Sequence, residues 1–103
     1  MLPMDSLPAP AAAPAATLLN GVTVIDLTTS IAGPYATMLL GDMGARVIKV
    51  ERPGRGDPSR AFDALFGPGQ SSYFVGMNRN KRSIALDLSN DEGRAIARRL
   101  VAD

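Results

Sequence analysis

The 103-residue sequence contains no cysteine, no histidine and no tryptophan. Without cysteine there can be no disulfide framework and no thiol nucleophile, and without histidine there can be no imidazole acid–base chemistry. The common zinc sites use these same two residue types, so we expect no metal site. Any catalysis by this chain would depend on carboxylates, amines, guanidinium groups, hydroxyls or backbone amides.

Positive charge is missing from the first part of the chain. Residues 1–45 contain no lysine or arginine, whereas residues 46–82 carry eight basic side chains and three acidic ones. An anionic ligand would be attracted to this second part. The net charge of the whole chain is only +1, and the basic cluster Asn78–Arg82 is small, so we expect no nucleic-acid partner.

The first eighteen residues are rich in alanine and proline. Their prolines interrupt any helix, so we expect residues 1–18 to form a disordered leader. The leader has neither the basic start and apolar core of a secretory signal nor the arginines of a mitochondrial presequence. No apolar run approaches the roughly 20 residues that span a bilayer. We therefore expect no membrane partner and, by default, a cytoplasmic location.

The pattern that follows is strand, helix, strand. Gly21–Leu27 is an apolar, β-branched run typical of a buried strand, and Arg46–Glu51 is a second one. Between them, Gly33 and Pro34 suit a helix start and Gly44 suits a helix end. The predicted inner stripe of this helix consists of Ala32, Tyr35, Ala36, Leu39, Leu40 and Met43. A connection of this length makes a parallel pair with a right-handed crossover.

The remainder predicts a long loop, a third strand and a last helix. The loop covers Arg52–Gln70, a short element at Ser71–Met77 docks it on the body, and Ser83–Leu88 alternates as a strand does. Asn90 suits the N-cap of the final helix. The fold class is therefore α/β, with a Rossmann-like, three-layer parallel sheet. Three strands and two helices cannot cover both faces of such a sheet, so we expect an incomplete domain or one that needs a partner.

Ligands of parallel sheets bind at the carboxyl ends of the strands, which places Thr28–Pro34 and Arg52–Arg55 on one rim. The backbone amides at the helix start are a candidate anion site. Arg52 is either a phosphate ligand or a solvated loop residue. Asp26 is a candidate base if its pKa is shifted, although a carboxylate that accepts N–H bonds at the strand end is the more ordinary interpretation.

The motifs AGP, GARVIKVERPGRGD and NRNKRSIALD occur in this order. From about Leu19 to the last residue, the chain resembles the amino-terminal segment of the family III CoA-transferases, the CaiB/BaiF group. That group includes formyl-CoA:oxalate CoA-transferase, carnitine CoA-transferase and α-methylacyl-CoA racemase. The resemblance implies that residues 19–103 are the N-terminal part of a CoA-binding domain, which the family uses in interlocked homodimers.

The resemblance also implies site residues. The family's contacts to coenzyme A map to Ile31 and Ala32 after the first strand, to Arg52 after the second, and to Leu86, Asp87, Leu88 and Ser89 at the third. Coenzyme A or an acyl-CoA thioester would be the substrate, with no metal. The family's Asp nucleophile lies farther along than residue 103, so no catalytic residue can be assigned in this chain.

Three functions therefore stand as expectations. The chain is the CoA-binding start of an enzyme that moves CoA between carboxylic acids, or of an acyl-CoA racemase of the same family. Alternatively, it is a non-catalytic truncated fragment or a partner subunit that completes another chain.

Overall fold

The computed structural model describes residues 18–103, so the expected leader lies outside the described residues except for Leu18. The described chain forms, in order, β1 (Thr23–Asp26), α1 (Ala32–Asp42), β2 (Arg46–Glu51), the 3-10 helix η2 (Pro58–Ala61), α2 (Ser72–Met77), β3 (Lys81–Ala85) and α3 (Asp91–Ala102). None of these helices has the length and apolar character that crossing a membrane would require.

The three strands form one parallel sheet in the order β1-β2-β3, with β2 in the centre. The predicted α/β fold class is confirmed, and β2 has the predicted bounds. The third strand differs from the prediction, because it begins two residues earlier, at Lys81, and ends at Ala85. Lys81 can enter the sheet because its ammonium group is neutralised by Asp26. After Ala85 the ladder continues for one more bond, from Leu86 N to Glu51 O.

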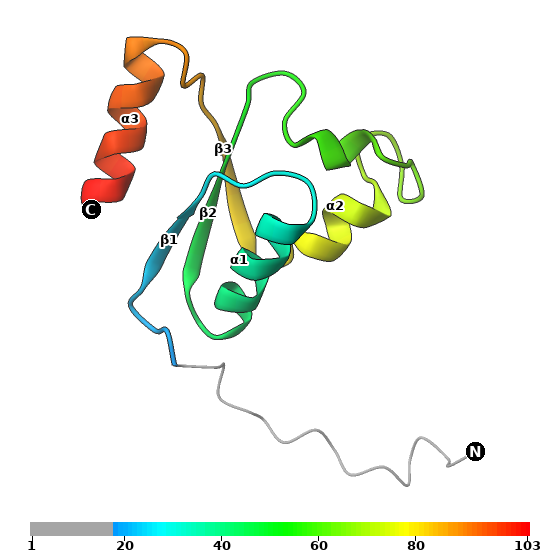
Figure 1. The fold of residues 1–103 in the computed structure, drawn as a ribbon, viewed down its shortest axis with the longest axis horizontal. Helices are drawn as coiled ribbons and strands as arrows, with labels where there is room; N and C mark the ends of the chain where they lie inside the picture. Colours follow the sequence, from blue (N-terminus) through cyan, green and yellow to red (C-terminus); the bar gives the residue numbers. More distant parts are fainter. Residues whose placement is uncertain (1–17) are drawn as a thin grey trace, which may run out of the picture.

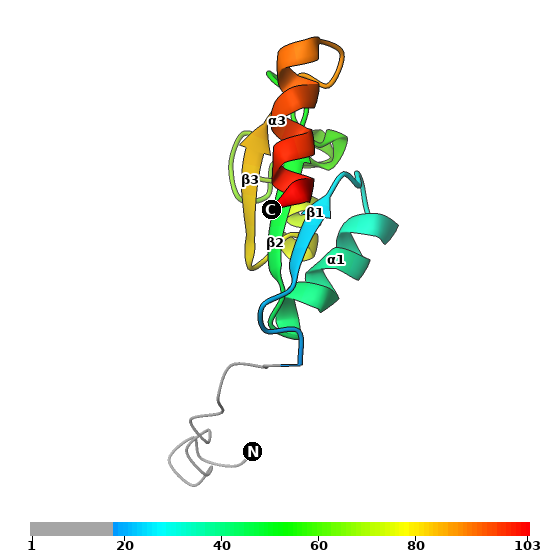
Figure 2. The same cartoon turned by 90° about the vertical axis from the view of Figure 1, so that its left-hand side faces the viewer.

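Helices lie on both sides of the sheet. Figure 1 shows the sheet nearly edge-on, with α1 and α2 on one face and α3 on the other. In Figure 2 the viewer looks onto the face where α3 lies. Because α3 makes few contacts with the strands, Val101 in its last turn remains 69% exposed. Ile25, Ile48 and Ile84 on this face of the sheet are only partly covered, which agrees with the expectation that these helices cannot cover both faces.

The predicted inner stripe of α1 is wrong. The buried residues of α1 are Pro34, Thr37 and Met38, whereas Tyr35 and Met43 of the predicted stripe are exposed. The buried face of α1 therefore combines the apolar Met38 with the polar Thr37. The Thr37 hydroxyl is buried because it donates to the buried Asp26 carboxylate.

The predicted helix-terminal residues behave largely as expected. Gly44 has φ 104° just after α1, and the Asn90 side chain accepts a hydrogen bond from Gly93 N at the start of α3. Pro34 lies in the first turn of α1, but it is the third residue of the helix and not the first, because the helix already begins at Ala32.

Gly33 brings the start of α1 into direct contact with the loop that follows β1. A Cβ at Gly33 would lie 2.4 Å from Thr28 Cβ, which no side-chain rotation can relieve. We predict that Gly33→Ala lowers the free energy of unfolding by about 1–3 kcal/mol, the usual cost of overpacking. Gly76→Ala in α2 is the matched control, because a Cβ there meets nothing within 4 Å. Urea unfolding monitored by circular dichroism measures both, and equal effects would contradict the predicted contact.

Candidate functional site

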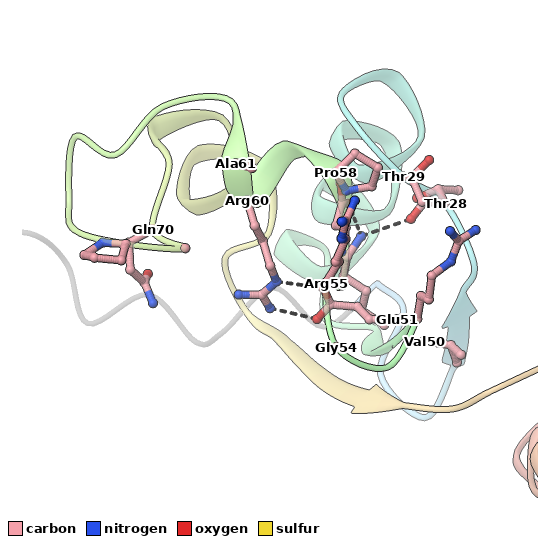
Figure 3. A pocket seen from close by; sticks show the side chains of 16 residues that line it. Thr28, Thr29, Val50, Glu51, Gly54, Arg55, Pro58, Arg60, Ala61 and Gln70 are labelled. Carbon is pink, nitrogen blue, oxygen red and sulfur yellow. Dashed lines mark hydrogen bonds and ion pairs between the residues drawn. The ribbon is translucent and has the colours of Figure 1, made fainter.

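Two adjoining cavities open at the carboxyl ends of the strands. The larger, of about 890 Å³, lies between the loop after β1 and the loop after β2, and it extends to Gln70. Figure 3 shows Thr28 and Thr29 on one side of this cleft and Gln70 on the other. The smaller cavity, of about 490 Å³, lies between the ends of β1, β2 and β3. Both cavities are lined by Thr29, Val50, Glu51 and Arg52, so they share one wall.

The structure brings together most of the predicted site residues. Arg52 and the four residues Leu86, Asp87, Leu88 and Ser89 line the smaller cavity, together with Leu27 and Thr29. These residues come from the ends of three different strands, as the rim hypothesis requires. Ile31 and Ala32 lie elsewhere: they form the start of α1, both are exposed, and neither lines either cavity.

Two arginines at the end of β2 are available to a ligand. Arg52 and Arg55 line the larger cleft, both are exposed, and neither side chain takes part in an ion pair within residues 18–103. Four of the other basic residues counted in the sequence are paired instead, namely Lys49, Arg60, Arg79 and Lys81. The sequence count therefore overestimates the charge that this part of the chain offers to an anion.

A buried ion pair joins the two loops of the larger cleft. Lys49 Nζ lies 2.8 Å from Asp57 Oδ2, and the two side chains are 1% and 0% exposed. Lys49 Nζ also donates to Thr28 O at 3.0 Å. Burial by itself would raise the pKa of Asp57, but the hydrogen bonds from Lys49, Ser59 N and Ser30 N outweigh burial and lower that pKa.

Glu51 anchors the far wall of the same cleft. Its carboxylate accepts two hydrogen bonds from the Arg60 guanidinium, at 2.8 and 2.7 Å, as Figure 3 shows. It also accepts from Ser83 and from Asp57 N. The bond from Arg60 is the largest cause that lowers the pKa of Glu51 to about 2, against the opposing effect of burial. Arg60 in turn lies 3.7 Å from the centre of the Phe74 ring, which fastens the long loop to α2.

Asp26 is held as a structural carboxylate. It is 1% exposed, it accepts from Thr28 N at 2.9 Å, and it pairs with Lys81 Nζ at 2.9 Å. Burial would raise its pKa, yet the hydrogen bonds from Thr28, Thr37 and Lys81 together lower it. A lowered pKa does not suit a general base. The ordinary interpretation of Asp26 is therefore confirmed, and the ammonium group of Lys81 is an additional partner.

Lys49 and Asp57 were not identified as important residues from the sequence. A lysine within the apolar strand RVIKVE was the available signal, because a fully buried lysine is rare unless it is paired. Its partner Asp57 could not be named from the sequence, since it lies in the irregular loop after β2. Ser30 N, which lies just before the anion site expected at the start of α1, already donates to Asp57 Oδ1 at 3.0 Å. Within residues 18–103 no group of carboxylates could hold a metal ion.

The chain matches the family model of CoA-transferase family III over residues 19–103. Succinyl-CoA:glutarate CoA-transferase of Mus musculus is 51% identical over 84 residues, which cover 82% of this chain and 19% of the relative. Succinyl-CoA–D-citramalate CoA-transferase of Chloroflexus aurantiacus is 45% identical, over 81% of this chain and 21% of the relative. A solved CaiB/BaiF family protein of Brucella suis is 43% identical, with a TM-score of 0.76, over 84% of this chain and 24% of that chain.

The protein is of the α/β class, with a parallel sheet and a polar cleft at the carboxyl ends of its strands. The match to the family model identifies the family. The chain belongs to CoA-transferase family III. It spans about a fifth of the length of the curated relatives that it matches.

The paired carboxylates predict a loss of stability in acid. The pKa of Glu51 falls from 4.5 to about 2 on folding, so its contribution is present above pH 4.5 and is lost as the pH falls toward 2. The lowered pKa values of Asp26 and Asp57 act in the same direction. We expect the Glu51 part to be on the order of 2–3 kcal/mol of unfolding free energy.

Urea unfolding at a series of pH values measures this loss. Glu51→Gln is the informative variant, because it cannot titrate and should show a smaller decrease in stability between pH 4.5 and 2. The same decrease in the wild type and in Glu51→Gln would refute the assignment to Glu51.

Proposed function

We propose that residues 19–103 are the N-terminal CoA-binding part of an enzyme that moves CoA between carboxylic acids. The observation that carries this proposal is that Arg52 and Leu86–Ser89 line one cavity at the carboxyl ends of the strands. Cavities at this edge of a parallel sheet are the usual ligand sites of such folds. The mouse and Chloroflexus relatives are named for CoA transfer between acids, which favours a transferase over a racemase.

The lining residues suit the parts of coenzyme A. The Arg52 guanidinium can donate two parallel hydrogen bonds to a phosphate group, and exposed Arg55 lies close enough to line the same larger cleft. Leu27, Leu86 and Leu88 supply apolar walls in the smaller cavity, against which an uncharged portion of the carrier would lie. Asp87 already accepts from Ser89 N at 2.9 Å, so this turn is preformed and its carboxylate is partly satisfied.

The remaining parts of the proposal follow from the family resemblance. The nucleophilic carboxylate would lie outside residues 19–103, and the complete enzyme would form the interlocked homodimer. The isolated 103-residue chain would therefore bind a CoA thioester without turning it over. A cytoplasmic location is proposed from the composition of the first eighteen residues and not from the resemblance.

Replacement of Arg52 tests the binding site. We expect Arg52→Ala to weaken CoA binding by about 1–3 kcal/mol, the usual effect of losing a hydrogen bond to a charged group, which is roughly a 5- to 150-fold increase in Kd. Isothermal titration calorimetry of the chain with CoA measures this change. Arg46→Ala is the matched control, because Arg46 is also exposed but lies at the opposite end of β2. Equal affinities of the wild type and Arg52→Ala would remove Arg52 from the site.

The absence of transfer by the isolated chain is a separate prediction. With succinyl-CoA and glutarate as substrates, we expect no glutaryl-CoA above the background without protein, as measured by mass spectrometry. Calorimetric CoA binding in the same preparation shows that the protein is folded. Clear turnover by this chain alone would contradict the assignment of the nucleophile to another part of the enzyme.

A further inference from the structure

We propose that the buried Lys49–Asp57 pair is a positioning device that sets the shape of the CoA site by fixing the loop after β1 against the loop after β2. This inference rests on the proposed function, because it concerns the same rim. Neither side chain would touch the ligand; both would act through the backbone of residues 28–30.

The contacts around this pair reach both loops. From β2, Lys49 Nζ donates to Thr28 O at 3.0 Å and pairs with Asp57 Oδ2 at 2.8 Å. From the loop after β2, Asp57 Oδ1 accepts from Ser30 N at 3.0 Å and from Ser59 N at 2.8 Å. Thr28 and Ser30 are thus held on either side of Thr29, one of the residues that line both cavities.

The backbone of Ser30 needs such support. Ser30 has φ 70°, a left-handed conformation that is unfavourable for residues with a side chain other than Asn or Asp. Its amide is bonded to the Asp57 carboxylate, so the ion pair stabilises the turn that leads from β1 into α1. Without that bond, Ser30 would be free to leave this conformation, and Thr29 would move with it.

Because both side chains are buried, the pair would position the loops and would not bind the ligand directly. Both residues line the larger cleft, but their side chains are only 1% and 0% exposed. The Lys49 ammonium group therefore cannot donate to a bound phosphate without a rearrangement, and the Asp57 carboxylate has no proton to donate. The partner of Asp57 Oδ2 is the Lys49 ammonium group, 2.8 Å away. Replacing a buried ion pair with apolar residues is often neutral for stability, whereas the pair can still specify one geometry. We therefore assign this pair to loop geometry.

The test compares Asp57→Asn with Asp42→Asn in the full 103-residue chain. Asp42→Asn is the matched control. It also removes a charge from an ion pair, but that pair joins Asp42 at the end of α1 to the exposed Arg79. We expect Asp57→Asn to raise the Kd for CoA at least about tenfold and to make exchange of the Ser30 amide at least about tenfold faster by NMR. Asp42→Asn should change each quantity less than twofold.

Adding Ser30→Gly to Asp57→Asn makes the test specific. Glycine adopts positive φ without steric cost, so the double variant should recover at least threefold of the lost CoA affinity. A role of Asp57 in general stability alone would not give this recovery. The proposal is overturned if Ser30→Gly gives no recovery, or if the Ser30 amide exchanges at the same rate in the wild type and in Asp57→Asn.

Two further measurements keep the outcomes distinct. If Asp57→Asn does not fold, Asp57→Glu replaces it, since it keeps the charge but displaces the carboxylate; unchanged CoA affinity and unchanged Ser30 exchange in this variant would overturn the proposal. If the wild type binds no CoA, the proposed function fails for this chain. Ser30 exchange then still decides whether Asp57 holds the loop.

Discussion

The structure depends on the neutralisation of charged side chains that point from the sheet into the interior of the protein. The central strand β2 directs Lys49 and Glu51 toward the face that α1 covers, where most parallel sheets carry apolar side chains. Each charge is paired with a residue from the following loop, Asp57 for Lys49 and Arg60 for Glu51. The loop after β2 is therefore anchored by ionic contacts, and its course fixes the two cavities at the end of the sheet.

This constraint also explains which parts of the structure the sequence could predict. Apolar runs and helix-terminal residues were sufficient for β2 and for the start of α3, because these features depend on local patterns. The common rim followed from the parallel pairing of the strands. The inner face of α1 was predicted wrongly, because the rule assumes that apolar residues face the sheet, and here Thr37 faces the buried Asp26. The partner of Lys49 could not be predicted, since their contact depends on the path of an irregular loop.

The polar interior has a consequence for binding. Half of the basic side chains between residues 46 and 82 are in ion pairs, so a ligand meets Arg52 and Arg55 at the mouth of the larger cleft and not a broad positive surface. Apolar surface remains partly uncovered on the opposite face, where α3 makes few contacts with the strands. The chain, which spans about a fifth of its relatives' length, thus combines two cavities at the carboxyl ends of the strands with an incompletely covered sheet.

The central claim is that the carboxyl ends of the three strands form one site for coenzyme A. Mapping of backbone NMR chemical shifts during a titration with CoA tests it most directly. We predict that the largest chemical-shift changes occur at Thr29, Arg52 and Leu86–Ser89. Little change is expected at Gly44–Arg46, at the amino end of the central strand. Changes concentrated at Gly44–Arg46 or on α3, with none at the rim, would contradict this claim.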